Sequence, residues 1–250
     1  MSATAQDRLS EAAAQTCTLF EFHPHNQQEQ VMKYANLAAP GREMPTTDAL
    51  TLMHVPAKFD VTQWPREVEA FLHKTTNPHH RAMLKNYFRH LLLEVAGYWN
   101  QIIVPELTVD EPMYRVGDRR QMHVLTGKVA VEGFYREAAE TRQNVMGART
   151  MNMGVDDYGV TTEAVWTHVV PGVCLKDHGI DADPAAHYLM THHLFQIFTY
   201  TNEPKPKLIA ERIYDDPESY TYEKLAPADV VTPEIARELL APFLARATLD

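Results

Sequence analysis

Two adjacent carboxylates in front of a proline are the residues best suited to chemistry in this chain. Asp110 and Glu111 precede Pro112 in TVDEPMYRVGDRRQMHVLTGKVAVEGFY, and apolar residues lie on both sides of the pair. Proline favours extended backbone before it, where only one of two neighbouring side chains can point inward. A carboxylate held out of water there has a raised pKa and suits proton transfer. The pair is equally compatible with a solvated turn or a salt bridge at a rim.

Histidines form a second group of candidates. His168, in EAVWTHVV, shares one face of an extended segment with Trp166 and could act as a general acid or simply be a satisfied interior histidine. Imidazoles also bind zinc and iron, and close pairs occur at His23/His25, His79/His80 and His192/His193. Neighbouring histidines in a strand point to opposite faces, and there is no HExxH motif. The sequence therefore predicts no bound metal.

No motif indicates a nucleotide, nicotinamide or serine-nucleophile site. The chain has no GxGxxG after a strand pattern, no GxxxxGKS/T and no GxSxG. Cys174 could be a nucleophile, but no partner residue is indicated, so a structural role is favoured. We therefore predict chemistry without a cofactor.

Composition limits the classes of partner. The 250 residues carry a formal net charge of −10, which disfavours binding to nucleic acid or to an anionic membrane. Two cysteines give neither a disulfide framework nor a four-cysteine zinc site. The start, MSATAQDRLSEAAAQ, lacks the pattern of a secretory signal, and no segment approaches the roughly 18 apolar residues of a membrane span. We expect a soluble, cytoplasmic protein.

The chain divides into three parts that would position these residues. Residues 1–62 are expected to form an N-terminal arm, because polar and proline-rich stretches dominate them. Residues 63–222 are expected to form the main domain. Residues 223–250 are expected to form a C-terminal helical tail, whose helix begins after Thr232 and is bent or ended by Pro242.

The main domain shows helical patterns first and strand patterns later. Residues 79–103 carry two adjacent apolar rows at helical spacing, which Gly97 could divide into two helices, and Gly127 to about Gln143 form a second helix. Two hairpins are predicted, from residues 148–155 with 160–170 across DDYG and from residues 191–200 with 208–214 across NEPKPK. This order predicts an α+β fold in which a curved antiparallel sheet wraps around helices.

The order of elements resembles that of the nuclear transport factor 2-like superfamily, most closely its ketosteroid isomerase and SnoaL-like cyclase branches. The resemblance covers about residues 66–222 and is carried by TVDEP, GKVAVEGFY and FTYTNEPKPKLIAERIYDD. It implies a cone-shaped α+β barrel with an apolar pocket at its open end, and a homodimer formed through the exposed sheet face. Such pockets serve isomerases, dehydratases, cyclases, epoxide hydrolases and binding proteins, so the fold alone does not choose among them.

The resemblance also implies roles for individual residues. Glu111 matches the proton-shuttling carboxylate of the ketosteroid isomerases, and Tyr87 matches the tyrosine that donates to the oxyanion. The second oxyanion donor of that family is a carboxylic acid, whereas Gln196 falls at its place and cannot be a protonated acid. A steroid isomerase is therefore doubtful. Histidines act as general acids in the superfamily's dehydratases, a role open to His168. The expected pocket liners are Tyr98, Tyr114, His123 and Trp166.

We expect a cofactor-independent acid–base enzyme that dehydrates, isomerises or cyclises a hydrophobic, oxygenated small molecule. Glu111 or Asp110 would remove a proton or activate water, while Tyr87 and Gln196 would stabilise the charge that develops on oxygen. Two alternatives stay open. One is a non-catalytic module of the same fold that binds a ligand or assembles a complex, with residues 1–62 as its interaction surface. The other is a metal-dependent enzyme that uses clustered histidines.

Overall fold

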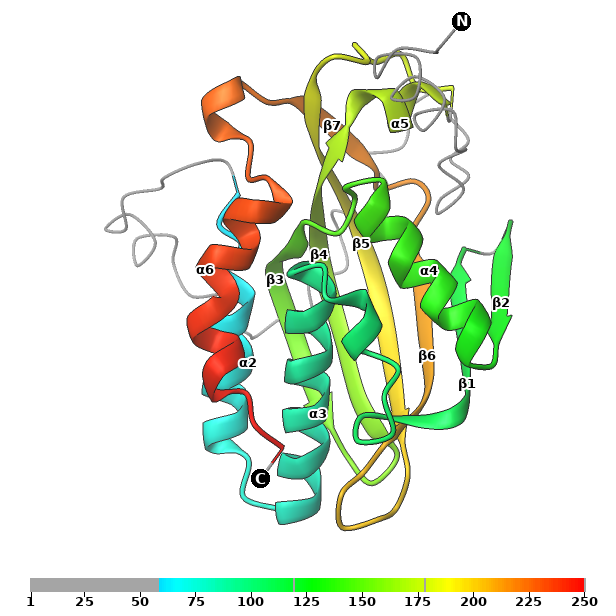
Figure 1. Ribbon diagram of the computed structural model, residues 1–250, viewed down its shortest axis with the longest axis vertical. Coiled ribbons are helices and arrows are strands. Elements are labelled where there is room, and N and C mark those ends of the chain that lie inside the picture. The colour runs from blue at the N-terminus through cyan, green and yellow to red at the C-terminus, as the bar shows by residue number, and fades with distance from the viewer. Residues whose placement is uncertain (1–58, 119, 178, 250) are drawn as a thin grey trace, which may run out of the picture.

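A computed structural model describes residues 59–118, 120–177 and 179–249. Within them, helices cover one face of a seven-stranded sheet (Figure 1). The helices are α2 (Gln63–Lys74), α3 (Pro78–Val95), α4 (Lys128–Glu140), α5 (Gly172–Asp177) and α6 (Pro233–Arg246), with short 3-10 turns η2 (Trp99–Gln101) and η3 (Pro227–Asp229). The strands are β1 (Thr108–Gly117), β2 (Met122–Thr126), β3 (Met146–Val155), β4 (Gly159–Pro171), β5 (His187–Tyr200), β6 (Leu208–Asp215) and β7 (Thr221–Lys224). The arm predicted for residues 1–62 lies almost wholly outside the described residues.

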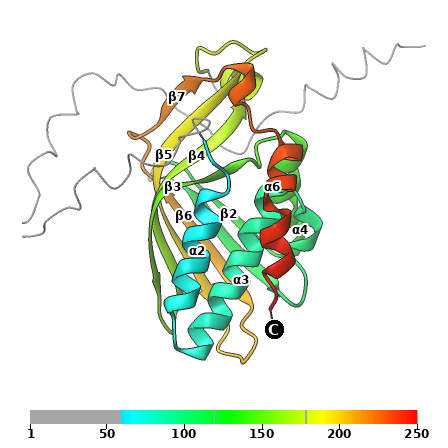
Figure 2. The ribbon, with the colours of Figure 1, turned by 90° about the vertical axis from the view of Figure 1, so that its left-hand side faces the viewer.

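The sheet curves but does not close. Its strand order is β2-β1-β6-β5-β4-β3, and β7 pairs with β5 at one end. In Figure 2 the helices α2 and α3 lie on one side of the sheet, with α6 beside them. The α+β class and the cone-shaped, curved sheet predicted from the sequence are confirmed. One pair departs from the predicted antiparallel arrangement, because β1 pairs with β6 in parallel.

Both predicted hairpins are confirmed. β3 pairs with β4 and β5 pairs with β6, each in antiparallel register. The turn between β3 and β4 is stabilised by Asp156, whose Oδ1 accepts hydrogen bonds from the backbone N–H groups of Tyr158 and Gly159 at 2.8 and 3.1 Å. An aspartate that bonds to the backbone just ahead of it favours a tight turn.

The long helix α3 begins and ends as the sequence indicates. The side chain of Asn77 accepts hydrogen bonds from the first backbone N–H groups, and Pro78 occupies the first helical position. The helix ends at Val95, and Gly97 follows with φ of 75°, a conformation that glycine adopts without strain. Gly97 therefore does divide the predicted segment, and η2 follows it.

The C-terminal helix α6 begins as predicted, and it excludes one of the two effects predicted for Pro242, an end to the helix. Thr232 caps its first turn through a hydrogen bond from the N–H of Ile235, as expected. Pro242, however, does not end the helix, which continues to Arg246. Leu240 and Phe243 are buried in the same core as α3, so the loss of one backbone hydrogen bond at the proline is offset by packing.

One large core joins the helices to the inner face of the sheet. It extends from Phe59, ahead of α2, to Ala247 at the end of α6. A smaller apolar cluster lies under α5 and β7 and is built from Val170, Cys174, Leu175, Met190 and Tyr220. The inner face of the sheet also carries several buried polar side chains.

Candidate functional site

The carboxylates singled out in the sequence lie on the surface. Asp110 and Glu111 are both exposed. Pro112, the next residue of β1, is buried. β1 directs Pro112 and Tyr114 inward, which turns Glu111 outward by alternation. Asp110 is also exposed because the register of β1 with β6 shifts between Thr108 and Met113. The expectation that one of the two acids is held in an apolar chamber is therefore wrong.

Glu111 instead lies beside the start of α4. A Cβ placed on Gly127, the residue that precedes α4, would come within 2.8 Å of Oε2 of Glu111. Gly127 also donates a backbone hydrogen bond of 2.8 Å to the carbonyl of Pro112. A carboxylate near a helix N-terminus is favoured by the positive end of the helix dipole. This placement indicates a local structural role for Glu111.

A different set of ionisable side chains lies inside the cone, and we call it the interior acid cluster. Its members are His90 and Glu94 of α3, Tyr114 of β1, Tyr135 of α4 and Glu211 of β6. The Tyr135 hydroxyl is 2.8 Å from Nε2 of His90 and 3.0 Å from both the Tyr114 hydroxyl and Oε2 of Glu211. Glu94 approaches from the next turn of α3, with Oε2 3.8 Å from Nε2 of His90. Helices and sheet thus converge on two acids and three partners.

Hydrogen counting fixes the donors in this cluster when Glu211 is ionised. A carboxylate only accepts, so the single proton of the Tyr135 hydroxyl points to Glu211. His90 must then donate to the oxygen of Tyr135 and carries its proton on Nε2. The single proton of the Tyr114 hydroxyl goes either to the oxygen of Tyr135 or directly to Glu211. Nδ1 of His90 has no hydrogen-bond partner among the described residues, which suits an unprotonated nitrogen. The network is directional, and every donor in it leads toward Glu211.

Burial sets the charge states of the cluster. Desolvation raises the pKa of Glu211 to about 7, although hydrogen bonds from Tyr135 and Tyr114 oppose this. Desolvation and the nearby charge of Glu211 raise the pKa of Glu94 well above its usual range. Desolvation lowers the pKa of His90 to about 3, so its 3.7 Å approach to Glu211 is a contact of a neutral imidazole rather than an ion pair. Both carboxyl groups therefore bind a proton more readily than an exposed glutamate does.

Two further tyrosines lie against this cluster. Tyr87, predicted from the sequence as an oxyanion donor, is fully buried, and burial raises its hydroxyl pKa. The Tyr200 hydroxyl is also buried and has no hydrogen-bond partner among the described residues. Its pKa is raised by burial and then by the nearby groups of Tyr87 and Glu211. A buried hydroxyl without a partner is costly, and it marks a place where an oxygen of a ligand or of water would be bound.

The remaining predicted residues have varied positions. Tyr114 belongs to the interior acid cluster. Gln196 is buried on the inner face of β5, where its Oε1 accepts a hydrogen bond of 2.9 Å from Thr162. Trp166 is packed in the main core, His123 is part-buried on the edge strand β2, and Tyr98 lies under the guanidinium of Arg237. No hydrogen bond joins Gln196 or these last three to the interior acid cluster in the described part of the chain.

His168 is buried, but in a separate group of side chains. Its Nε2 lies 3.1 Å from Nε2 of His192, and Nδ1 of His192 lies 3.0 Å from Oδ1 of Asp215. Within residues 59–118, 120–177 and 179–249, no group of three or more His, Cys, Asp or Glu side chains is placed to hold a metal ion. The pair His192/His193 is split as expected, since His192 is buried and His193 is exposed.

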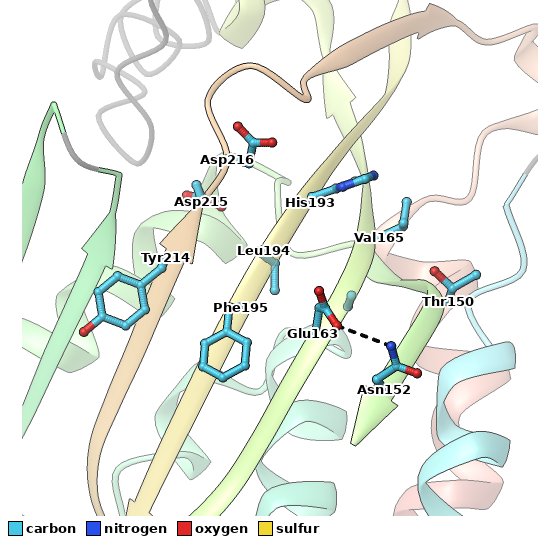
Figure 3. Close-up of a pocket in the computed structure, with 11 residues that line it drawn as sticks. Thr150, Asn152, Glu163, Val165, His193, Leu194, Phe195, Tyr214, Asp215 and Asp216 are labelled. Carbon is cyan, nitrogen blue, oxygen red and sulfur yellow. Dashed lines mark hydrogen bonds between the residues drawn. The ribbon is translucent and has the colours of Figure 1, made fainter. Parts of the chain in front are cut away.

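The outer face of the sheet is hollowed over β3 to β6 (Figure 3). We call this concavity, of about 500 Å³, the outer hollow. Its rim carries the exposed aromatic rings of Phe195 and Tyr214. Nδ2 of Asn152 donates a hydrogen bond of 3.4 Å to Oε2 of Glu163 in its lining. The other lining residues are Thr150, Ala164, Val165, His193, Leu194, Asp215 and Asp216.

No helix in the described part of the chain is long and apolar enough to cross a bilayer.

Sequence reasoning missed most of the interior acid cluster. His90 and Glu94 are four residues apart on α3 and follow Tyr87 at helical spacing, so polar side chains recur on the largely apolar inner face of the helix. That recurrence was a usable signal. The sequence around Glu211 gave a weaker signal. A register irregularity between β5 and β6 buries both Ala210 and Glu211, so the strand does not alternate regularly between buried and exposed residues.

Comparisons with known proteins give only remote similarities. No family model and no curated protein matches the sequence. Among solved structures, the chain is similar to SalBIII, an epoxide hydrolase/cyclase-like enzyme with a role in pyran ring formation in the polyether salinomycin. The two share 11% identity with a TM-score of 0.39, and the match covers 62% of this chain and 93% of that chain. It is also similar to the phenazine biosynthesis-related protein phzb2 from Pseudomonas aeruginosa, with 10% identity and a TM-score of 0.33 over 65% of this chain and 84% of that chain. At these values neither similarity assigns an activity.

Proposed function

We propose that this protein is a cofactor-independent acid–base enzyme acting on a hydrophobic small molecule that carries a carbonyl or related oxygen. The observation that carries the proposal is the pair Glu94 and Glu211, whose side chains are 11% and 4% exposed and lie beside one network of histidine and tyrosine donors. A general base works best when its pKa lies near the working pH, and burial raises the pKa of Glu211 to about 7. The proposal moves the catalytic carboxylate from Glu111 to Glu211.

The proposed step is removal of a proton from a carbon next to a carbonyl. Oε2 of Glu211 takes the proton, and the electron pair of the broken C–H bond moves onto the carbonyl oxygen as an enolate. The Tyr200 hydroxyl, which has no hydrogen-bond partner among residues 59–118, 120–177 and 179–249, donates to that oxygen together with Tyr87. Return of the proton from Glu211 to another carbon isomerises the substrate. Dehydration instead passes that proton to a departing β-hydroxyl, which leaves as water while the enolate electrons form the new C=C bond. One preorganised donor of this kind typically contributes on the order of 100-fold in rate.

The surroundings of the cluster support an apolar substrate. The ring of Phe198 packs edge-on against Tyr87 and His90, at centroid distances of 4.8 and 6.0 Å. Ile213 is the next inner-face residue of β6 after Glu211, and its apolar side chain is partly exposed. Apolar walls with few polar groups are typical of small-molecule sites.

Hydrogen–deuterium exchange at carbon tests the proposal without knowledge of the natural substrate. The protein is incubated in deuterated buffer with a panel of hydrophobic enolisable ketones, and label uptake is followed by mass spectrometry. We expect exchange above the buffer rate for at least one ketone, and a loss of about 100-fold or more in Glu211→Gln. Glu111→Gln is the matched control, because it removes an exposed carboxylate, and it should exchange as the wild type does. Equal exchange by wild type and Glu211→Gln would refute the proposal.

A non-catalytic binding module is the second candidate function. The exposure of Asp110 and Glu111 is the observation that favours it, because a binding module has no need to enclose an acidic pair. It predicts that a ketone binds, as seen by ligand-detected NMR, and that its carbon-bound protons do not exchange faster than in buffer. The same experiment therefore separates the two functions.

We also propose that the outer sheet face joins two copies in a homodimer. Phe195 and Tyr214 are directly paired across β5 and β6 and are 41% and 37% exposed, respectively. Exposed aromatic pairs are typical of protein interfaces. Light scattering after size exclusion should give a dimer for the wild type and a monomer for Phe195→Glu. A wild-type monomer at all concentrations would contradict this.

A further inference from the structure

Two arginines lie side by side on the outer face of the sheet. Arg115 of β1 is paired in register with Arg212 of β6, in the parallel ladder that joins these strands. Both side chains point outward, because their neighbours Tyr114 and Glu211 are buried on the inner face. Adjacent strands are about 4.8 Å apart, and like charges directly opposite each other are destabilising. The pair therefore costs stability unless a negative group binds to it.

No acid in the described part of the chain neutralises this pair. Neither arginine forms an ion pair with a carboxylate there, and the exposed Arg115 has no hydrogen-bond partner there. Acids are not scarce, since the protein has 33 acidic and 23 basic residues. Glu163 and Asp216 of the same sheet face line the outer hollow instead. Two adjacent cations without a carboxylate indicate a negative partner from outside these residues.

Arg212 is held so that one edge of its guanidinium stays free. Its Nη1 donates to the Tyr158 hydroxyl at 2.7 Å and to Oγ1 of Thr199 at 3.1 Å, which uses both protons of that nitrogen. The guanidinium carbon also lies 5.9 Å from the centre of the Tyr158 ring. Nε and Nη2 have no partner in the described part of the chain, and their parallel N–H groups form a fork for two oxygens of one anion. The fork is thus oriented before a ligand binds.

Apolar side chains flank the two arginines on the same face. Val124 of β2 is opposite Arg115 and is 56% exposed. Ile197 of β5 is opposite Arg212 and is partly exposed. A few charged groups set among apolar neighbours are typical of sites for small organic molecules. This row of side chains suits an anionic group that is attached to an apolar body.

We propose that Arg115 and Arg212 bind the phosphate group of a small organic phosphate monoester. Such a group carries a charge of about −1.5 to −2 at pH 7, which matches two guanidinium groups better than a singly charged carboxylate does. Its three terminal oxygens can engage the fork of Arg212 and the guanidinium of Arg115 together. The net charge of −10 disfavours nucleic acid as the source of the phosphate. The apolar body then lies along Val124 or Ile197.

Titration with phenyl phosphate, followed through the Nε–H signals of the arginines in NMR, tests the proposal. We expect one saturable site that shifts the signal of Arg212, with a dissociation constant of about 1 mM or lower. Benzoate, a singly charged anion with the same ring, should bind at least about tenfold more weakly. Inorganic phosphate should compete for the site and bind more weakly than phenyl phosphate, because it lacks the apolar body.

Substitutions assign the binding to the arginine pair. Arg115→Ala should weaken phenyl phosphate binding at least about tenfold, because it removes the charge-assisted hydrogen bonds of one guanidinium. Tyr158→Phe should weaken binding by a smaller factor, since Arg212 keeps its charge and loses only one orienting contact. Arg66→Ala is the matched control. It removes an exposed arginine from α2, on the other side of the sheet, and should bind as the wild type does.

Several results would overturn the proposal. These are the lack of a saturable shift at Arg212, equal binding by Arg115→Ala and the wild type, or equal affinities for phenyl phosphate, benzoate and inorganic phosphate. A change from dimer to monomer in Arg115→Ala, seen by light scattering, would show that the arginines contact a second copy instead. The site uses no residue of the interior acid cluster. Glu211→Gln should therefore bind phenyl phosphate normally, whatever the carbon-exchange experiment shows.

Discussion

Replacement of Glu211 by glutamine should change how the stability of the protein depends on pH. Burial raises the pKa of this carboxyl from 4.5 to about 7. The folded state therefore binds the proton more tightly than the unfolded state, so stability is highest at low pH and is lost as pH rises through about 7. At about 1.4 kcal/mol per tenfold change in proton affinity, ionised Glu211 costs the folded state about 3 kcal/mol above that pH. Glutamine keeps the shape and cannot ionise.

Chemical denaturation of wild type and Glu211→Gln at about pH 5 and about pH 8 measures this effect. Part of the cost is already present at the lower pH, so the wild type should lose about 2 to 3 kcal/mol more than Glu211→Gln between the two conditions. Glu94 responds in the same direction, because its pKa is raised partly by the charge on Glu211. The exposed variant Glu111→Gln should keep the wild-type dependence. An identical dependence in Glu211→Gln and wild type would refute the description of Glu211 as a buried, proton-binding acid.

Three further substitutions test separate parts of the structure. Tyr200→Phe removes a buried hydroxyl that has no hydrogen-bond partner in the described part of the chain, so denaturation should show unchanged or up to about 1 kcal/mol higher stability, while carbon exchange falls. A large loss of stability would show that the hydroxyl is bonded in the folded protein. Gly147→Ala would place a Cβ 2.4 Å from Cδ1 of the buried Trp64, so we expect a loss of about 1 to 3 kcal/mol, and no loss would mean that α2 does not pack closely on β3. Thr232→Ala removes the cap of α6 and should cost about 1 kcal/mol in denaturant titrations, whereas the nearby Thr248→Ala should cost less.

Local patterns predicted most of the architecture. The helical periodicity of α3 and the strand patterns around DDYG and NEPKPK identified their elements, because burial of one face enforces a period in the sequence. The parallel contact of β1 with β6 joins segments about 100 residues apart, and no local pattern records such pairing. Similarly, the continuation of α6 through Pro242 depends on packing against α3, which the sequence of the helix alone does not show.

The candidate site was harder to predict than the fold. Tyr87 and Tyr114 were correctly expected in the interior, since apolar spacing on a helix and alternation on a strand both point inward. Asp110 and Glu111 were misplaced because a register shift in β1 exposes two adjacent residues. Glu211 was overlooked because its burial follows from a similar shift between β5 and β6. Irregular register is a tertiary property, so side chains beside it cannot be assigned to a face by counting.

Infrared spectroscopy of the carboxyl groups tests the central claim most directly. A protonated carboxylic acid inside a protein absorbs apart from ionised carboxylates, so the charge of Glu211 can be followed without a substrate. We predict a band of a buried acid that disappears as pH rises through about 7 and that is absent or displaced in Glu211→Gln. The band should persist unchanged in Glu111→Gln. A wild-type spectrum with no protonated carboxyl at about pH 6 would contradict the account.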